Sequence, residues 1–355
     1  MNKLTKSLSS FVVPLISILL AFLVGMIIMV CMGKNPADAL YFLGFGAFGN
    51  AANFGTTLSK ATPLIFTSLC ACFAYRCGVF NLGGEGQFIM GSVAACYVAL
   101  RSGITGVPAM ILCLAAGMAA GGVWGLVPGV LKITRGQNEM IISIMLNYVA
   151  TLFMGVVYTN WLRDASVPQT EAVPNETKLP RVLTGMRFTY ALVIAIVVGL
   201  LIYYFLFWTS GGFKLRAVGI NMTASRFNGF PVKRYILTSF IVSGAIAGLG
   251  GAAELLGTQF RLINGFGAGY GFDGVAMALI GQLHPIATMV VAVFFAALRT
   301  GSMTMQAGTG VPTSVSDIIQ ALVIVFTVAG MALTKLPQFE QLRYRLRSRK
   351  GGNAA

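Results

Sequence analysis

The sequence predicts an all-α membrane protein with about ten transmembrane helices. Three observations predict this class: 56% of the 355 residues are hydrophobic, only 10% are charged, and the mean hydropathy is +0.80. A soluble domain carries about 25% charged residues, and a chain this apolar would expose aggregating patches in water. Lipid is therefore the expected solvent for most of its side chains.

Ten apolar runs approach the length of about 20 residues that a helix needs to cross a bilayer. The third and eighth runs are short and interrupted by glycine. The break between the eighth and ninth runs, at Gly281–Pro285, leaves nine spans as an alternative. The expected spans are residues 11–32, 58–75, 85–100, 107–131, 139–160, 189–208, 235–257, 270–283, 285–299 and 315–334.

The basic residues predict the orientation of these spans. With the N-terminus inside, sixteen of the 25 Lys and Arg residues fall in inner segments, and the other nine, Lys60 and Arg299 among them, fall in outer segments. Cytoplasmic loops are enriched in Lys and Arg, so we expect both termini in the cytoplasm. The net charge of +15 lies in short clusters between apolar runs rather than on one face, which argues against a nucleic-acid partner.

Ten spans divide into two halves of five. An odd number of helices in each half gives the halves opposite orientations, as in transporters built from inverted repeats. We expect a polytopic domain at 1–335, with one half at 11–160, an outer polar loop at 161–188 and the second half at 189–335. A basic cytoplasmic tail follows at 336–355.

Each half contains one short glycine-rich segment with a single carboxylate, Glu85 in Phe80–Gln87 and Asp273 in Gly269–Gly274. Matched broken segments mark a translocation path, and a carboxylate at membrane depth costs about 2.5–3.5 kcal/mol. Capping a helix start, where the dipole favours an anion, is the alternative role for both residues. Chance similarity of two glycine-rich turns is the alternative to a repeat.

Three amides and a tyrosine are further candidates for the path. Asn81 and Gln87 flank the first glycine segment, and Asn147 and Tyr148 lie in the middle of the span 139–160. Interhelical hydrogen bonds, worth about 0.6 kcal/mol each, are the alternative use of such residues.

Two acidic residues lie near the outer ends of their spans. We expect Glu254 and Asp317 to be hydrated there, with a proton-relay role as the alternative.

The inner loop 209–234 carries five basic residues and no acidic one. Asn221 is a good helix cap, Thr223–Phe227 is long enough for a short helix, and Asn228-Gly229 is a stop signal. A loop that only joins two spans needs no such helix. The pattern favours a docking site for a cytoplasmic protein, and a helix lying on the lipid surface is the alternative.

Motifs for catalysis and for cofactor binding are missing from the sequence. The six cysteines form no CxxC pair and there is one histidine, so we expect no metal site. No GxxxxGK[ST] loop and no catalytic motif occur, so we expect no catalytic residues, no bound cofactor and no nucleotide site in this chain.

Four segments, in order between residues 76 and 281, resemble the permease subunits of ATP-binding-cassette importers of the simple-sugar, nucleoside and branched-chain amino-acid branch. They are Arg76–Gln87, which contains the "FNxGxEGQ" pattern, Gly136–Tyr148, which is similar to "NEVIxTIMLNY", Leu215–Asn221 and Gly269–Ala276. The "GGEGQ" and "IMLNY" forms look most like the nucleoside-type members.

The resemblance implies a multi-pass permease of a bacterial inner membrane. Its expected partners are a second permease subunit, identical or homologous, ATPase subunits that hold ATP and Mg, and an extracytoplasmic solute-binding protein. The ATPase would drive alternating access by pushing on the loop 209–234. The docking candidates in this loop are Arg216, Gly219, Asn221, Arg226 and Gly229.

Nucleosides are the expected substrate of such a permease, and simple sugars are the second possibility. An ion-coupled secondary transporter of a small polar solute is the rival function. It would need a buried carboxylate or histidine network for the coupling ion, and it would work without an ATPase.

Overall fold

A computed structural model describes residues 3–164, 167–183 and 186–333, and the regular secondary structure within them is helical apart from two isolated β-bridges. The basic tail predicted at 336–355 lies outside the described residues. The helices are α1 (Lys3–Cys31), α2 (Pro36–Phe48), α3 (Ala51–Arg76), α4 (Gly84–Arg101), α5 (Gly106–Arg135), α6 (Glu139–Val156), η1 (Val157–Trp161), η2 (Asn175–Thr177), α7 (Tyr190–Trp208), α8 (Ser210–Ile220), α9 (Met222–Phe227), α10 (Val232–Glu254), η3 (Leu255–Gln259), α11 (Tyr270–Ile280), α12 (Pro285–Thr309) and α13 (Thr313–Leu333).

Eight helices in the described part of the chain are long and apolar enough to cross a membrane. The expected spans 85–100 and 270–283 correspond to α4 and α11, which are not among the eight. The first turn of α4 is polar, and the 11 residues of α11 extend only about 16 Å. A multi-pass membrane protein is confirmed, while ten spans and cytoplasmic termini stay predictions. The break at Gly281–Pro285 separates two helices, since α11 ends at Ile280 and α12 begins at Pro285.

The chain forms two compact units. The first contains residues 1–46 and 301–355, and within it α1 packs against α13. Gly25 permits this packing, because a Cβ atom there would lie 2.6 Å from the side chain of Ile319.

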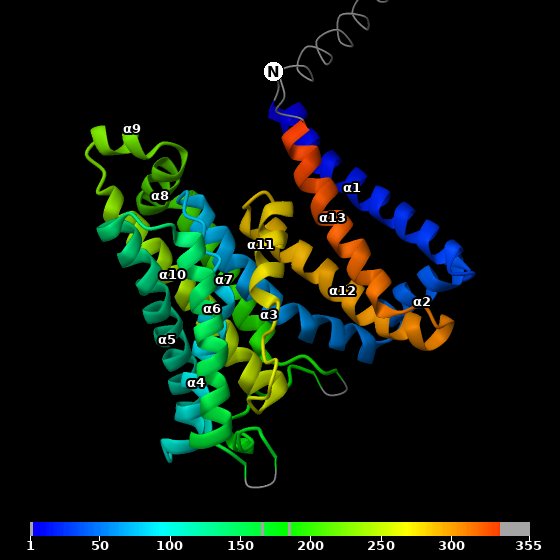
Figure 1. Ribbon diagram of the computed structural model, residues 1–355, viewed down its shortest axis with the longest axis horizontal. Coiled ribbons are helices and arrows are strands. Elements are labelled where there is room, and N and C mark those ends of the chain that lie inside the picture. Colours follow the sequence, from blue (N-terminus) through cyan, green and yellow to red (C-terminus); the bar gives the residue numbers. More distant parts are fainter. Residues whose placement is uncertain (1–2, 165–166, 184–185, 334–355) are drawn as a thin grey trace, which may run out of the picture. The chain divides into compact units, whose positions relative to one another are not determined.

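The second unit, residues 47–300, holds every predicted site residue. Helix α10 is its centre and packs against α3, α4 and α5 (Figure 1). Glycines make these contacts close: a methyl group at Gly91 of α4 or at Gly121 of α5 would overlap the backbone of Gly248 in α10. Close backbone approach through small residues is the usual way in which helices pack in lipid.

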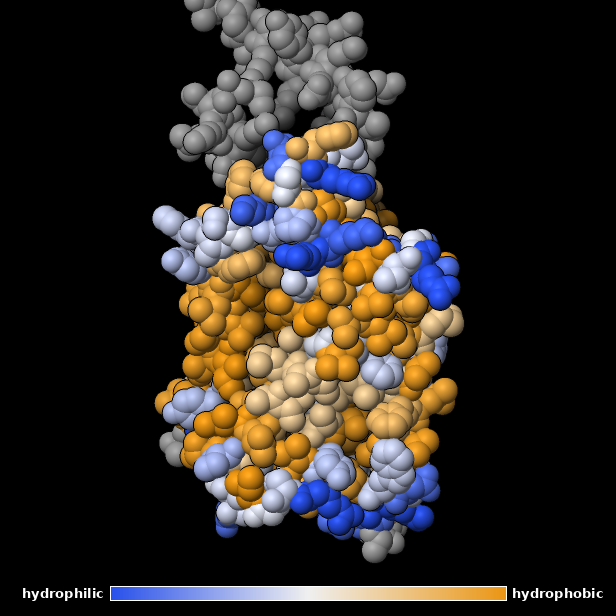
Figure 2. Space-filling model, turned by 90° about the vertical axis from the view of Figure 1, so that its left-hand side faces the viewer, coloured by the Kyte–Doolittle hydropathy of each residue, from blue (hydrophilic) through white to orange (hydrophobic). Residues whose placement is uncertain are grey.

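The surface of one face carries an apolar band between two polar ends (Figure 2). Exposed side chains on the long helices supply such a surface, for example Ile111 and Val123 of α5, each 63% exposed, and Leu152 of α6, 72% exposed. Apolar side chains that face outward from a helix are expected where the solvent is lipid.

Candidate functional site

The two short helices predicted to match, α4 and α11, begin beside each other. Glu85 lies in the first turn of α4, and its Oε2 accepts a hydrogen bond from the backbone N–H of Gly269 at 3.0 Å. Gly269 is the residue that precedes α11. Any side chain at Gly271 would overlap Glu85, whose Cα would lie 2.8 Å from the added Cβ atom. Glu85 therefore caps the start of α11 rather than that of its own helix.

Asp273 in the first turn of α11 is bound differently. It forms an ion pair with Arg299 of α12, and both side chains are partly accessible, at 27% and 30%. Lys60 of α3 lies close enough to Arg299 for the two positive charges to repel each other. Counting Lys60 and Arg299 as outer loop charges did not predict the ion pair between Arg299 and Asp273. The available signal was that each falls inside an expected span, where a charge marks a functional or paired residue.

Asn81 and Gln87 are brought together in a buried hydrogen-bond network before and within α4. Each is 1% exposed. Asn81 Nδ2 donates to Gln87 Oε1 at 3.0 Å and to Ser243 Oγ of α10 at 2.8 Å, and Gln87 Nε2 donates back to Asn81 Oδ1 at 3.2 Å. Asn81 Oδ1 also accepts the N–H of Gly83 at 3.0 Å. The two amides thereby fix the glycine-rich turn against α10.

Asn147 joins the same turn to α6. Its Oδ1 accepts the N–H of Gly86 at 2.8 Å, and its Nδ2 donates to the carbonyl of Leu82 at 2.9 Å. Tyr148, the next residue, is 65% exposed and lies on the outer side of α6. Five of the six path candidates are therefore gathered around the starts of α4 and α11, and Tyr148 is not. Their role in a path stays a prediction.

The two outer carboxylates differ from each other. Asp317 is exposed, as expected of a hydrated residue. Glu254 is only 3% exposed, so the expectation of hydration is wrong for it. Glu254 is the last residue of α10, and the chain continues directly into the five-residue π-helix η3 instead of entering an outer loop. Gln259 Nε2 of η3 donates to the Oε1 of Glu254 at 3.4 Å.

At the other end of α10, the predicted docking loop forms two helices. Asn221 caps α9 as expected, since its Oδ1 accepts the N–H of Ala224 at 2.9 Å. Gly229 adopts a φ of 77° after the helix, a conformation that favours glycine. Ile220 and Phe227 project into the surroundings, at 87% and 88% exposure. Helix α8, which precedes α9, was not predicted.

The predicted docking residues lie in two different environments. Arg226 is exposed on α9. Arg216 instead lies half-buried on α8, with its guanidinium over the ring of Phe207 at 4.9 Å. Gly219 faces inward, where a Cβ atom would lie 2.9 Å from the backbone of Cys77 and Gly78.

Arg76 connects this end of α8 to the loop between α11 and α12. Its Nε donates to the carbonyl of Leu283 at 2.7 Å, and its Nη2 donates to that of Gln282 at 3.4 Å. Gln282 and Leu283 both have positive φ, 53° and 56°, which is uncommon for residues other than glycine. Burial, and to a smaller extent the charge of Arg76, lowers the pKa of the adjacent His284. The docking loop and the α11–α12 loop are thus joined through the end of α3.

The family of the chain follows from residues 53–328, which match the family described as the permease component of the branched-chain amino acid transport system. This chain belongs to that permease family. The match covers most of the chain and includes every path and docking candidate named above. Together with the apolar helices, it makes the protein a multi-pass component of a bacterial plasma membrane that works with ATPase and solute-binding partners.

Three relatives share most of their length with this permease. The guanosine ABC transporter permease protein NupP of Bacillus subtilis is 34% identical and covers 93% of this chain and 96% of its own. The nucleoside ABC transporter permease protein NupB of Lactococcus lactis is 30% identical over 100% of both chains. The glucose ABC transporter permease protein TsgB13 of Haloferax volcanii is 29% identical and covers 89% of this chain and 87% of its own.

Proposed function

We propose that this permease carries nucleosides into the cytoplasm as part of an ATP-driven importer. The observation that supports this substrate is the full-length similarity, at 34% and 30% identity, to permeases named for guanosine and for nucleosides. Simple sugars are the second candidate, because a glucose permease is 29% identical over a comparable length.

The meeting point of α4 and α11 supports a path built from two inverted five-helix repeats. Each short helix begins at a glycine-rich turn with one carboxylate in its first turn, and Glu85 of one binds the backbone that starts the other. Counted with the eight long helices, α4 and α11 give ten spans with both termini in the cytoplasm. Transport would then proceed by alternating access around this point.

Helix α9 supports a docking role for the loop 209–234. A solvated loop rarely holds two large apolar side chains at nearly full exposure, as Ile220 and Phe227 are, beside the basic Arg226. A partner ATPase, which would hold ATP and Mg, is the proposed occupant of this surface, and hydrolysis is assigned to it rather than to this chain. Gly219 and Arg76 offer a route from α8 to the α11–α12 loop.

The remaining proposed partner is a second permease subunit, identical or homologous. The outward face of α6 supports it, since Ile141, Met145, Tyr148 and Leu152 form an exposed apolar stripe at helical spacing.

An ion-coupled secondary transporter is the rival function, and Glu254 is the observation that favours it. A carboxyl group enclosed at 3% exposure near one end of α10 is the kind of residue that binds a coupling proton. Such a transporter would take up solute with this chain alone and would respond to Glu254→Gln.

The deciding experiment is uptake into proteoliposomes that contain this permease, its partner permease, the ATPase and the binding protein. We expect uptake of guanosine that requires ATP and all four components and is competed by other nucleosides but not by ribose. Competition by ribose or glucose alone would replace the nucleoside assignment by the sugar one. Uptake by this chain alone under a proton gradient would overturn the ATP-driven function.

Docking is tested separately by Phe227→Asp combined with Arg226→Glu. This pair places two negative charges on an exposed helix without touching a buried contact, so membrane insertion is expected to be unchanged. We expect co-purification of the ATPase to be lost. Lys233→Glu, an exposed basic residue on the next helix, is the matched control. Normal ATPase retention in the double variant would contradict the docking role of α9.

A further inference from the structure

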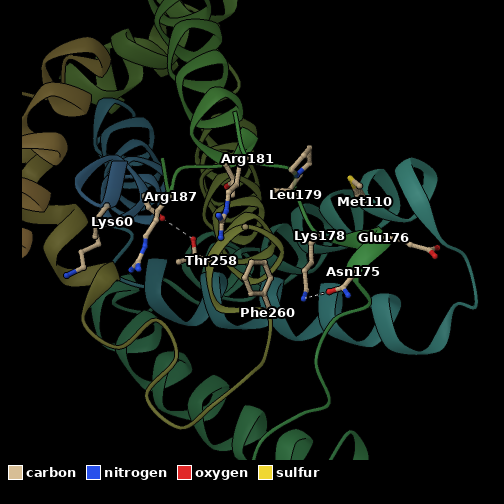
Figure 3. Close-up of a pocket in the computed structure, with 15 residues that line it drawn as sticks. Lys60, Met110, Asn175, Glu176, Lys178, Leu179, Arg181, Arg187, Thr258 and Phe260 are labelled. Carbon is tan, nitrogen blue, oxygen red and sulfur yellow. Dashed lines mark hydrogen bonds between the residues drawn. The ribbon is translucent and has the colours of Figure 1, made fainter. Parts of the chain in front are cut away.

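A cavity of ≈ 860 Å³ lies at the end of α10 that is opposite to α9 (Figure 3). Its walls come from the loop before α7, the first turns of α3 and the segment that follows α10. The volume is in the range of small-molecule sites. The lining residues that matter for its chemistry are Lys60, Glu176, Lys178, Arg181, Arg187 and Phe260.

Main-chain hydrogen bonds fix the shape of this outer pocket. The N–H groups of Thr170, Val173 and Leu179 in the loop donate to the carbonyls of Leu262, Phe260 and Leu256, at 3.1, 2.9 and 2.9 Å. These bonds tie residues 170–179 of the loop to residues 256–262 after α10. This part of the pocket wall is therefore preformed rather than assembled by a ligand.

The backbone conformation of Phe260, which lines the pocket, is typical of functional sites. Phe260 adopts a φ of 57°, a left-handed conformation that is uncommon for a bulky residue and that clusters at functional sites. It directly follows the π-helix η3, another feature that is frequent at such sites. In this conformation its ring lies 4.7 Å from Lys178 Nζ, which also donates to Asn175 Oδ1 at 2.6 Å. The strained residue thus holds a cation in place.

The charge of the pocket is not balanced. Four cationic side chains line it against the single carboxylate of Glu176. Among the described residues, Lys178, Arg181 and Arg187 have no carboxylate within ion-pair distance. In the view of Figure 3, Arg181 and Arg187 extend toward the same space, with Thr258 between them. A concave surface of one sign focuses the field and concentrates ions of the opposite sign.

Membrane topology does not account for these cations. Lys and Arg gather in the cytoplasmic loops of membrane proteins, but this pocket lies at the far end of α10 from the basic docking loop. Its cations therefore lie on the predicted outer side, where Lys and Arg do not favour the predicted orientation of the helices. A bound anion gives a physical reason for keeping these cations in one cavity.

We propose that the outer pocket binds a phosphate group. The guanidinium groups of Arg181 and Arg187 extend toward one space beside Thr258, where arginine can give a phosphate paired, charge-assisted bonds. Lys60 and Lys178 add positive charge to the lining. The cavity is larger than one phosphate ion, so the group belongs either to a phosphorylated solute or to the headgroup of an anionic lipid. The site does not depend on which solute the permease transports.

The test uses the complete transporter, purified in detergent and placed in nanodiscs of phosphatidylcholine. Binding of radiolabelled inorganic phosphate and of glycerol 3-phosphate is measured by equilibrium dialysis, with glycerol as the phosphate-free control. We expect saturable binding of at least one phosphate probe and none of glycerol. Arg181→Gln with Arg187→Gln should weaken it by about tenfold or more, because charge-assisted bonds are lost. Both residues are exposed, so the fold should be unaffected.

The matched control is Arg101→Gln with Arg163→Gln, which removes two exposed charges from the same side of the chain outside the pocket. It should bind as the unmodified protein does. To identify the source, the same variants are prepared in nanodiscs with phosphatidylglycerol and analysed by native mass spectrometry. Retention of phosphatidylglycerol that the pocket variant loses assigns the site to lipid, and soluble-probe binding in phosphatidylcholine assigns it to a solute.

Absence of saturable binding for inorganic phosphate, glycerol 3-phosphate and phosphatidylglycerol would overturn the proposal. So would equal losses in the pocket and control variants, since that would indicate a general charge effect. If the pocket variant binds every probe normally but no longer retains the solute-binding protein, the pocket is a protein-docking surface and the phosphate site is wrong. Each readout is a binding measurement, so failure of the transport assay does not decide it.

Discussion

Glu85 and Asp273 both lie in the first turn of a short helix, yet their charges are compensated in different ways. Glu85 accepts a backbone hydrogen bond from the turn that starts α11, whereas Asp273 forms an ion pair with Arg299 of α12. The first bond joins the two short helices to each other, and the second joins one of them to a long helix. Glu85 thus fixes the start of α11 through a backbone N–H group, whereas Asp273 does so through the charge of Arg299.

The largest effect is expected from Asp273→Asn. Removing the carboxylate leaves Arg299 without its charge partner inside an apolar helix, and breaking a buried pair costs about 3–5 kcal/mol. Because both side chains are partly accessible, we expect about 2–3 kcal/mol, seen as a lower melting temperature of the purified transporter.

The double variant Asp273→Asn with Arg299→Gln is the control for that experiment. It removes both charges, so it should recover much of the stability that the single variant loses. A double variant no more stable than the single one would mean that the ion pair does not hold α11.

Asn147→Leu tests whether the turn that carries Glu85 also depends on its contact with α6. The change leaves the N–H of Gly86 and the carbonyl of Leu82 without their partner, and an unsatisfied buried group costs about 1–3 kcal/mol. We expect about 2 kcal/mol of destabilisation in thermal melts.

Val123→Ala in α5 is the control, because that side chain is 63% exposed and lies outside the proposed subunit surface on α6. It should change stability by less than about 0.5 kcal/mol. Loss of guanosine uptake by Asn147→Leu at normal stability would point to the path role instead, and equal destabilisation by both variants would remove the argument for the α6 contact.

Glu85→Gln should have the smallest effect of the three. The amide keeps an oxygen that accepts from Gly269 and loses only the charge, which is worth about 1 kcal/mol at a helix start. Melting curves of Glu85→Gln and Asp273→Asn should be measured side by side. A less stable glutamine variant would show that the charge of Glu85 contributes more to stability than the ion pair of Asp273.

The sequence predicted the helical class and the short helix α9 well because both depend on local patterns. Apolar runs define the long helices, and Asn221 caps α9 through its own neighbours. The same patterns pointed to the glycine-rich turns whose helices meet at Glu85.

What the sequence did not predict depends on contacts between distant residues. The pairing of Asp273 with Arg299 and the burial of Glu254 at the junction of α10 and η3 follow from packing that no short pattern encodes. Tyr148 was grouped with Asn147 because the two are adjacent, although adjacent helical residues face different sides. The phosphate pocket has its cations on segments more than 100 residues apart, Lys60 and Arg187 among them, which individually look like ordinary loop charges.

The glycine contacts among α4, α5 and α10 have a consequence for motion. Where Gly91 and Gly121 approach Gly248, backbone touches backbone and no side chain can change rotamer to absorb a displacement. Sliding or tilting these helices relative to one another would therefore cause immediate steric overlap. We therefore expect α4, α5 and α10 to move as one rigid body. The hinges of any conformational change should then lie outside these helices, for example at the strained connection of Gln282 and Leu283.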